Sequence, residues 1–223
     1  MMAAQFAILR DVIWSPSRAV TTAAEEKNFW IVKGLVLAMA GLSTALANQF
    51  MVQVAINGAS SYNAARTLAS TSSITGYLAV AVSIAGQIVS WHVTAALLLC
   101  LNYLMPCTEV PYRGHLSLAV LASLIANLAP FHLLIVWHAR GAEAFESIHE
   151  LFVPMGLNLL PIKMSPLVWN LLGHFSPYEL SSAAFLVFGF STLTHMRLKV
   201  GFAALGSIWL VWTLVRAALF KLP

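Results

Sequence analysis

The stretch Ile74–Met105 reads ITGYLAVAVSIAGQIVSWHVTAALLLCLNYLM and contains no aspartate, glutamate, lysine or arginine. An apolar helix of about 20 residues is enough to cross the ~30 Å hydrocarbon core of a bilayer. This stretch is long enough to cross the core with a tilt or to project beyond it. It predicts a transmembrane helix and thereby decides the class of protein.

Four more apolar stretches lie on either side of this one. In lipid, the backbone polar groups of a spanning segment must be satisfied within the segment, so each span is expected to be helical. The predicted fold is an all-α polytopic helical membrane bundle with about five transmembrane helices and short interfacial helices. The fourth span is the shortest and the least apolar. The spans are expected at about 29–50, 74–105, 115–137, 178–195 and 198–220.

The composition excludes an ordinary soluble domain. Hydrophobic residues make up 60% of the chain and charged residues only 9%, whereas roughly a quarter of the residues in soluble domains are charged. The net charge is +4, but the basic residues lie near the ends of apolar segments, where they orient spans and meet anionic headgroups. No cluster of basic residues is interleaved with aromatic ones, so the expected partner is the lipid bilayer and not a nucleic acid.

The N-terminal segment 1–28 has the pattern of a surface helix. Phe6, Leu9, Val12 and Ile13 recur at helical spacing, with the charged Arg10 and Asp11 on the other side. Such a helix lies in the plane of the membrane interface. We therefore expect a cytoplasmic interfacial amphipathic segment over 1–28, followed by a five-span membrane domain over 29–223. The charged residues also interrupt any apolar signal-peptide core, so no cleavable signal is expected.

Serine–proline pairs predict where three helices begin. Serine is a good N-cap, and proline is tolerated at the first helical position. Ser15-Pro16 is expected to start a second N-terminal helix, and Ser165-Pro166 a short helix within the long 138–177 connection. Ser176-Pro177-Tyr178-Glu179 fits a capping box at the start of the fourth span. Spans four and five are separated by a very short loop, so we expect them to be antiparallel neighbours.

Small residues and one proline predict how two of the spans pack. Gly34, Ala38, Gly41 and Ala45 share one face of the first span, which allows close approach of another helix. Pro130 is expected to kink the third span, because proline cannot donate the usual backbone hydrogen bond. Residues 51–73 and 106–114 are expected to be connections, the first polar and the second a tight turn.

The positive-inside rule predicts the orientation. An N-terminus in the cytoplasm and an odd number of spans place the C-terminus outside. Seven basic residues then lie inside: Arg10, Arg18, Lys27, Lys33, Arg113, Arg197 and Lys199. Five lie outside: Arg66, Arg140, Lys163, Arg216 and Lys221.

Five uncharged or weakly basic polar residues fall within the predicted spans two and three. Polar side chains inside a membrane are costly and usually face the interior of the bundle. They could line a polar path or ligand cavity, or they could form interhelical hydrogen bonds worth about 0.6 kcal/mol each. The second interpretation is favoured, because no carboxylate lies in the core of any span. The residues are Gln87, His92, Asn102, Asn127 and His132.

The motifs of catalysis and metal binding are missing from the sequence. No histidines have the H-E-x-x-H spacing of zinc enzymes, and no G-x-S-x-G nucleophile elbow occurs. Cys100 and Cys107 do not form a C-x-x-C pair. We therefore predict no enzymatic activity, no catalytic residues, no cofactor and no metal site.

Three stretches of the chain resemble the Yip-domain family of five-span membrane proteins, in particular its bacterial branch. They are Leu9–Ala19 with the aromatic pair Phe29-Trp30; Trp91 with Tyr112-Arg113-Gly114; and Phe175–Leu180 through Phe188–Ser191 to Arg197–Val200, ending at Trp209–Trp212. The resemblance implies a five-span fold and a place in the bacterial inner membrane. It implies no catalytic residues. Eukaryotic members bind Rab-type GTPases through a long N-terminal region; here that region has only about 28 residues, so GTPase binding is not carried over.

Together these features favour a non-enzymatic membrane scaffold, organiser or assembly partner that acts through its interfacial helices. It would work with another membrane protein or as a homo-oligomer. The alternative is a small transporter or channel component with a polar path in spans two and three. An intramembrane enzyme is the third reading, and it lacks a nucleophile with a paired base.

Overall fold

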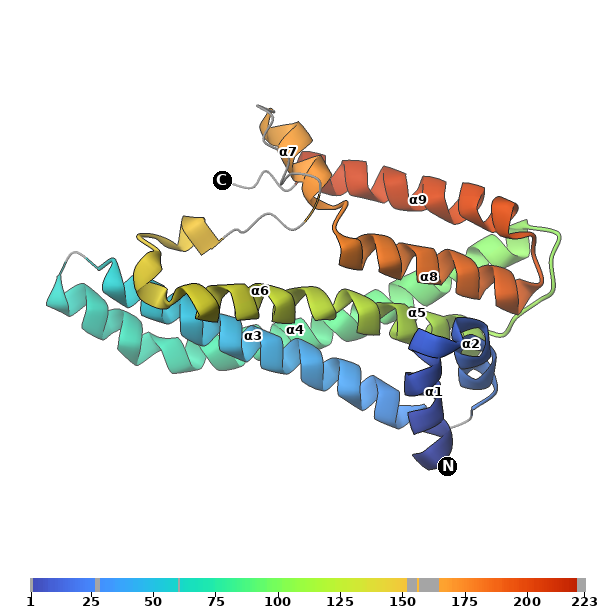
Figure 1. Ribbon diagram of the computed structural model, residues 1–223, viewed down its shortest axis with the longest axis horizontal. Helices are drawn as coiled ribbons and strands as arrows, with labels where there is room; N and C mark the ends of the chain where they lie inside the picture. Colours follow the sequence, from blue (N-terminus) through green and yellow to red (C-terminus); the bar gives the residue numbers. More distant parts are fainter. Residues whose placement is uncertain (1, 27–28, 60, 152–155, 157–164, 220–223) are drawn as a thin grey trace. The chain divides into compact units, whose positions relative to one another are not determined.

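The structure is a computed structural model that describes residues 2–26, 29–59, 61–151, 156 and 165–219 (Figure 1). Within these ranges every regular element is a helix, which confirms the all-α class. The α-helices are α1 (Met2–Trp14), α2 (Pro16–Glu25), α3 (Trp30–Asn57), α4 (Tyr62–Leu104), α5 (Tyr112–Ala126), α6 (Leu128–Arg140), α7 (Pro166–Gly173), α8 (Pro177–Thr194) and α9 (Leu198–Leu219); two short 3₁₀ helices are η1 (Ala142–Ala144) and η2 (Ile148–Leu151).

The chain forms two compact units. The first contains the described residues within 1–36, 89–126 and 155–222, and the second contains those within 37–88 and 127–154. The long helices α3 and α4 each contribute to both units. The break between α5 and α6 coincides with a boundary between the units, so the two helices of the predicted third span belong to different units.

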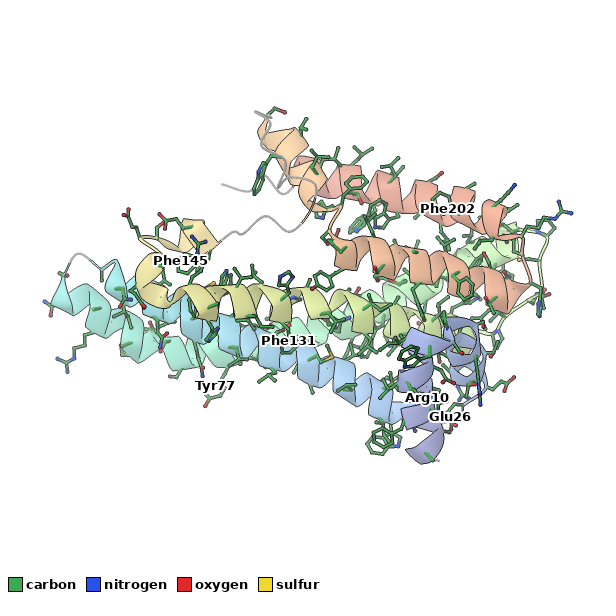
Figure 2. The ribbon with its side chains drawn as sticks, viewed as in Figure 1. Arg10, Glu26, Tyr77, Phe131, Phe145 and Phe202 are labelled. Carbon is green, nitrogen blue, oxygen red and sulfur yellow. The ribbon has the colours of Figure 1, made fainter. Side chains whose placement is uncertain are left out.

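Within the part of the chain that the structure describes, four helical stretches are long and apolar enough to cross a membrane, which supports a membrane location. They are Trp30–Asn57, Ala65–Leu104, Tyr112–Arg140 and Leu198–Val215. Their large apolar side chains are widely exposed, as lipid-facing residues are; Tyr77, for example, projects from α4 away from the helices (Figure 2).

The predicted fourth span, α8, is not among these four stretches, and the count of five spans remains a prediction. The surroundings of α8 explain its lower hydropathy. It packs against α2, α5 and α9, and it buries Phe185, Val187 and Phe190 among them. Three of its hydroxyl groups, those of Ser182, Thr192 and Thr194, donate to carbonyl groups; Thr194 Oγ1, for example, donates to the Phe190 oxygen across 2.8 Å. A helix enclosed by protein in this way does not need lipid-facing apolar side chains on every side.

Helix α4 is longer than its apolar stretch predicts. Its 43 residues rise by about 1.5 Å each, giving about 65 Å, twice the thickness of a hydrocarbon core. The polar connection expected over 51–73 is correspondingly short, because α3 continues to Asn57 and α4 begins at Tyr62. Hydroxyl side chains in the first turns of α4 bond to carbonyls one turn back, as Thr67 Oγ1 does to Asn63 and Thr71 Oγ1 to Thr67.

In the first unit, α2 packs against other helices through small side chains. Ala19, Val20 and Ala23 are buried where α2 packs against α5 and α8. Gly189 of α8 faces the same region, and a Cβ atom there would overlap Leu118 and lie 3.2 Å from Val20. The glycine therefore permits the close packing of three helices. Helices α8 and α9 also pack together, as the short loop at their junction predicts.

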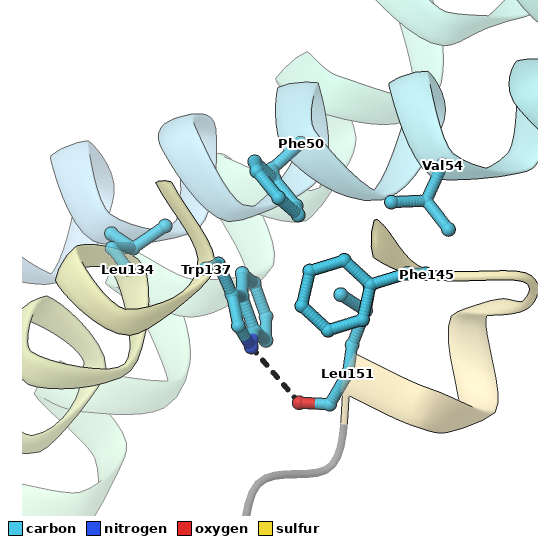
Figure 3. Close-up of a cluster of buried hydrophobic side chains, with 6 residues drawn as sticks. All are labelled: Phe50, Val54, Leu134, Trp137, Phe145 and Leu151. Carbon is cyan, nitrogen blue, oxygen red and sulfur yellow. Dashed lines mark hydrogen bonds between the residues drawn. The ribbon is translucent and has the colours of Figure 1, made fainter. Parts of the chain in front are cut away.

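In the second unit, six apolar side chains form a core between α3, α6 and the 3₁₀ helices (Figure 3). The rings of Phe50 and Trp137 stack with centroids 5.6 Å apart, and Phe145 meets Phe50 edge-on. The Trp137 indole N–H donates to the Leu151 carbonyl across 3.0 Å. This core fixes the beginning of the 138–177 connection to the long helices. The six residues are Phe50, Val54, Leu134, Trp137, Phe145 and Leu151.

Candidate functional site

A cavity of about 240 Å³ lies between α3, α4 and the start of α6, within the second unit. We call it the mid-span cavity, because its lining residues come from near the middle of three apolar stretches, Trp30–Asn57, Ala65–Leu104 and Tyr112–Arg140. It is lined by Ala40, Ser43, Thr44, Ala47, Asn48, Met51, Ala79, Ser83, Gln87, Asn127 and Pro130.

Two hydrogen-bonded pairs connect the helices at this cavity. The Thr44 hydroxyl of α3 donates to the Ser83 hydroxyl of α4 across 2.9 Å. The Asn127 amide nitrogen, just before α6, donates to the Gln87 side-chain carbonyl of α4 across 3.2 Å. Each pair satisfies polar groups that would be costly if they faced lipid alone. The cavity therefore has a polar lining that is held in place by interhelical bonds.

The lining also keeps polar groups that have no protein partner. Within the described ranges, no hydrogen bond is made by the Asn48 carboxamide, by the Gln87 amide nitrogen or by the Asn127 side-chain oxygen. Gly76 makes room for Asn48, because a Cβ atom at Gly76 would lie 2.8 Å from the Asn48 amide nitrogen. These groups can therefore donate to and accept from a molecule in the cavity.

A helix interruption borders the cavity. Residue Asn127 separates α5 from α6, and its side chain does not cap α6 but bonds to Gln87 instead. Three residues later, Pro130 has no N–H to donate, so the carbonyl four residues earlier loses its helical partner. The backbone at Asn127 stays in the right-handed helical region, with φ −70° and ψ −3°, so the interruption is a single residue long. The kink at Pro130 stays a prediction.

The structure brings together only Gln87 and Asn127 of the five polar residues predicted from the sequence. His132 belongs to the same unit, but it is exposed and does not line the cavity. His92 and Asn102 belong to the other unit. The exposed His92 ring stacks on Tyr112, with Nδ1 2.7 Å from the tyrosine oxygen.

Asn102 organises the turn between α4 and α5. Its amide nitrogen donates to the Thr108 carbonyl across 3.0 Å, and its oxygen accepts from the Val110 N–H across 2.9 Å. The same oxygen lies 3.2 Å from Nε2 of the buried His115. With all these partners used in one turn, Asn102 has a structural role in holding the Pro/Gly connection.

Sequence reasoning missed four polar residues of the cavity: Ser43, Thr44, Asn48 and Ser83. Hydroxyl groups in a span can bond to their own helix and so do not stand out as costly. The spacing carried a signal, however, because Thr44 and Asn48 are four apart, as are Ser83 and Gln87. Residues four apart share a helix face.

The N-terminal helix α1 has a second notable feature, an outward face made of Phe6, Arg10, Ile13 and Trp14. The three apolar residues are 60%, 77% and 78% exposed. The opposite side of the helix is turned into the protein and is partly polar: Gln5, Ile8 and Asp11 are buried.

Specific bonds hold this sidedness. The Gln5 side-chain oxygen accepts from the Ile31 N–H at the start of α3 across 2.7 Å. The Asp11 carboxylate is paired with Arg10 at 2.8 Å and with Arg18 of α2 at 3.4 Å. Three large apolar side chains therefore point outward beside Arg10, while the polar Gln5 and Asp11 point inward together with Ile8.

Among the residues that the structure describes, no three or more histidine, cysteine, aspartate or glutamate side chains are grouped so that they could hold a metal ion. The uncharged mid-span cavity also offers no general acid or base. Comparison with protein-family models, curated proteins and solved structures finds no match to this chain.

Proposed function

We propose that this chain is a non-enzymatic integral membrane protein that acts as a membrane scaffold, organiser or assembly partner. The observation that carries the proposal is the outward face of α1, which presents Phe6, Ile13 and Trp14 beside Arg10. Burying a large apolar side chain stabilises by roughly 1.5–3 kcal/mol, whereas a surface ion pair contributes at most about 1 kcal/mol. Apolar insertion therefore dominates the energetics of this face, and Arg10 adds attraction to anionic headgroups.

In this proposal α1 lies in the interface and α2 connects it to the membrane helices. Because α2 is packed against α5 and α8, any force on α1 from lipid or from a partner reaches the membrane-spanning part of the same unit. Rigid attachment of an inserted helix is what a bilayer-shaping or assembly function requires. A helix joined only by a flexible tether could bind lipid, but its insertion would exert no force on the membrane-spanning helices.

The finer topology is part of the proposal. Five spans, with α8 as the fourth, put the two termini on opposite sides of the membrane, and the positive-inside rule then favours a cytoplasmic N-terminus and an external C-terminus. The resemblance to the bacterial Yip-domain branch supports a place in the bacterial inner membrane. The partner would be another membrane protein or further copies of this chain.

The test compares two variants of the outward face after reconstitution into vesicles. One replaces Phe6, Ile13 and Trp14 with serine, and its matched control replaces them with leucine, leucine and phenylalanine. Deleting α1 and α2 would be a weaker test, because the deletion would expose the surfaces of α5 and α8 that α2 covers. We expect the wild type and the apolar control to change vesicle diameter equally, as seen by electron cryomicroscopy, and the serine variant to lose the effect. An equal effect from the folded serine variant would contradict the bilayer-organising role.

The mid-span cavity favours a second candidate function, a small transporter or channel component. Polar groups from three helices meet there, although His92, Asn102 and His132 do not line it. Leucine at both Gln87 and Asn127 would then abolish solute flux in proteoliposomes, whereas alanine at His92 or His132 would leave it unchanged. Equal flux in the leucine variant and the wild type would dismiss this candidate.

A further inference from the structure

We propose that the mid-span cavity binds a small uncharged solute that carries hydroxyl groups. The inference goes beyond the scaffold function, since it concerns the second unit and does not depend on the α1 face. Such binding requires a hydrated site that selects its ligand by charge and by hydrogen bonding. The described residues of the cavity provide a basis for both kinds of selection.

The charge of the ligand follows from the lining. All eleven lining residues are uncharged. An ion moved from water into a low-dielectric site without a counter-charge incurs a large desolvation penalty. A neutral molecule does not, so the lining selects against cations, anions and zwitterions alike.

The hydrogen-bonding groups of the ligand follow from the groups left without partners. The Asn48 carboxamide offers both a donor and an acceptor, the Gln87 amide nitrogen a donor, and the Asn127 oxygen an acceptor. A hydroxyl group can donate and accept at once. A molecule with two or three hydroxyl groups can therefore satisfy groups on α3, α4 and the start of α6 together.

The size and the apolar part of the cavity restrict the ligand further. A volume of about 240 Å³, in a cavity that is partly open at the protein surface, admits a molecule with several non-hydrogen atoms. Alanines and Met51 form the rest of the wall, where a short carbon skeleton would make van der Waals contact. A triol such as glycerol fits these limits and is a suitable probe.

The experiment measures thiol modification at position 83 in reconstituted full-length protein. Ser83→Cys places a thiol in the cavity wall. Val82→Cys is the lipid-facing control, as Val82 is 62% exposed on α4, and Asn63→Cys in the first turn of α4 is the water-exposed reference. A small uncharged reagent, methyl methanethiosulfonate, is applied, and modification is located by mass spectrometry so that Cys100 and Cys107 can remain.

A hydrated cavity predicts that Ser83→Cys reacts within about tenfold of the Asn63→Cys rate, because only the ionised thiol reacts and lipid suppresses it. Glycerol at about ten times its dissociation constant should slow position 83 by about tenfold, while position 63 is slowed only by the change in viscosity. Gln87→Leu added to Ser83→Cys should keep the labelling but lose the protection.

Two results would overturn the inference. If Ser83→Cys is as unreactive as Val82→Cys, the cavity is dry. If glycerol slows positions 83 and 63 by the same factor, the cavity is hydrated but has no polyol site. Neither result would affect the scaffold proposal, which is tested by the α1 variants.

Discussion

The side-chain amide of Asn127 donates a 3.2 Å hydrogen bond to the side-chain carbonyl of Gln87, forty positions earlier in the chain. The bond joins the residue before α6 to the middle of the longest helix. Both side chains were predicted from the sequence as polar residues within apolar spans. This bond gives the second unit a polar centre. Thr44 and Ser83 form a second hydrogen-bonded pair there.

The Gln87–Asn127 bond predicts a measurable coupling energy. Replacing either residue with leucine should destabilise the protein by about 1 kcal/mol or less, since interhelical bonds in membrane proteins average about 0.6 kcal/mol. The double variant should cost about 0.6 kcal/mol less than the sum of the single changes. Reversible unfolding in mixed detergent micelles measures all three. Additive costs would show that the pair does not interact.

Gly76 and Asn48 predict that Gly76→Ala stabilises the protein less in the wild type than in an Asn48→Ala background. In the wild type, Gly76→Ala forces the Asn48 amide to move, because the new Cβ would lie 2.8 Å from its nitrogen. In an Asn48→Ala background that obstacle is gone, and alanine should stabilise α4 by about 0.5–1 kcal/mol through its helix propensity. Thermal unfolding of the four proteins checks this. If Gly76→Ala stabilised the wild type as much as it stabilises the Asn48→Ala background, the Asn48 side chain would not lie against Gly76.

Gly189 should tolerate no side chain. An alanine Cβ there overlaps Leu118 and crowds Val20, so Gly189→Ala should destabilise the first unit by about 1–3 kcal/mol. The matched control is Gly34→Ala, where nothing lies within 4 Å of the new Cβ; it should be neutral or stabilising by up to about 1 kcal/mol. Melting temperatures of the two variants provide the comparison. Similar melting temperatures would contradict the close packing of α2, α5 and α8.

Two N-cap serines predict a difference between otherwise similar substitutions. Ser176 Oγ accepts a hydrogen bond from the Glu179 N–H across 3.2 Å, whereas Ser15 makes no side-chain capping bond, although proline follows both. Ser176→Ala should therefore cost about 1 kcal/mol and Ser15→Ala clearly less. Thermal unfolding of both variants is the measurement. Equal losses would mean that the cap at α8 contributes nothing specific.

Local signals in the sequence predicted much of this fold. Ser165 and Ser176 accept the capping bonds that their positions before proline predict. The long apolar stretches became helices for the reason expected, that an apolar segment satisfies its own backbone only as a helix. The ends of α3 and α4 were harder to predict. Thr67 and Thr71 look like loop residues, but their hydroxyls bond to helix carbonyls.

The parts that the sequence did not predict depend on tertiary contacts. The spacing of α1 predicted an amphipathic helix, but not that Asp11 is buried, because that depends on Arg18 in the next helix. Gly41 packs near Ile84 as its small size suggests, whereas at Gly34, predicted to share that face, no described atom lies within 4 Å of where a Cβ atom would be. Predicting the mid-span cavity would have required knowing how α3 is aligned against α4. That alignment cannot be read from either segment alone.

The scaffold function itself is tested most directly by identifying what is bound to the protein in cells. The wild type, the serine variant of Phe6, Ile13 and Trp14, and the apolar control would each be cross-linked in living cells, isolated in mild detergent and analysed by mass spectrometry. The proposal predicts a stoichiometric membrane-protein partner, or further copies of this chain, with the wild type and the apolar control, and its loss from the serine variant. Recovery of the wild type alone, or an unchanged partner in the folded serine variant, would contradict it.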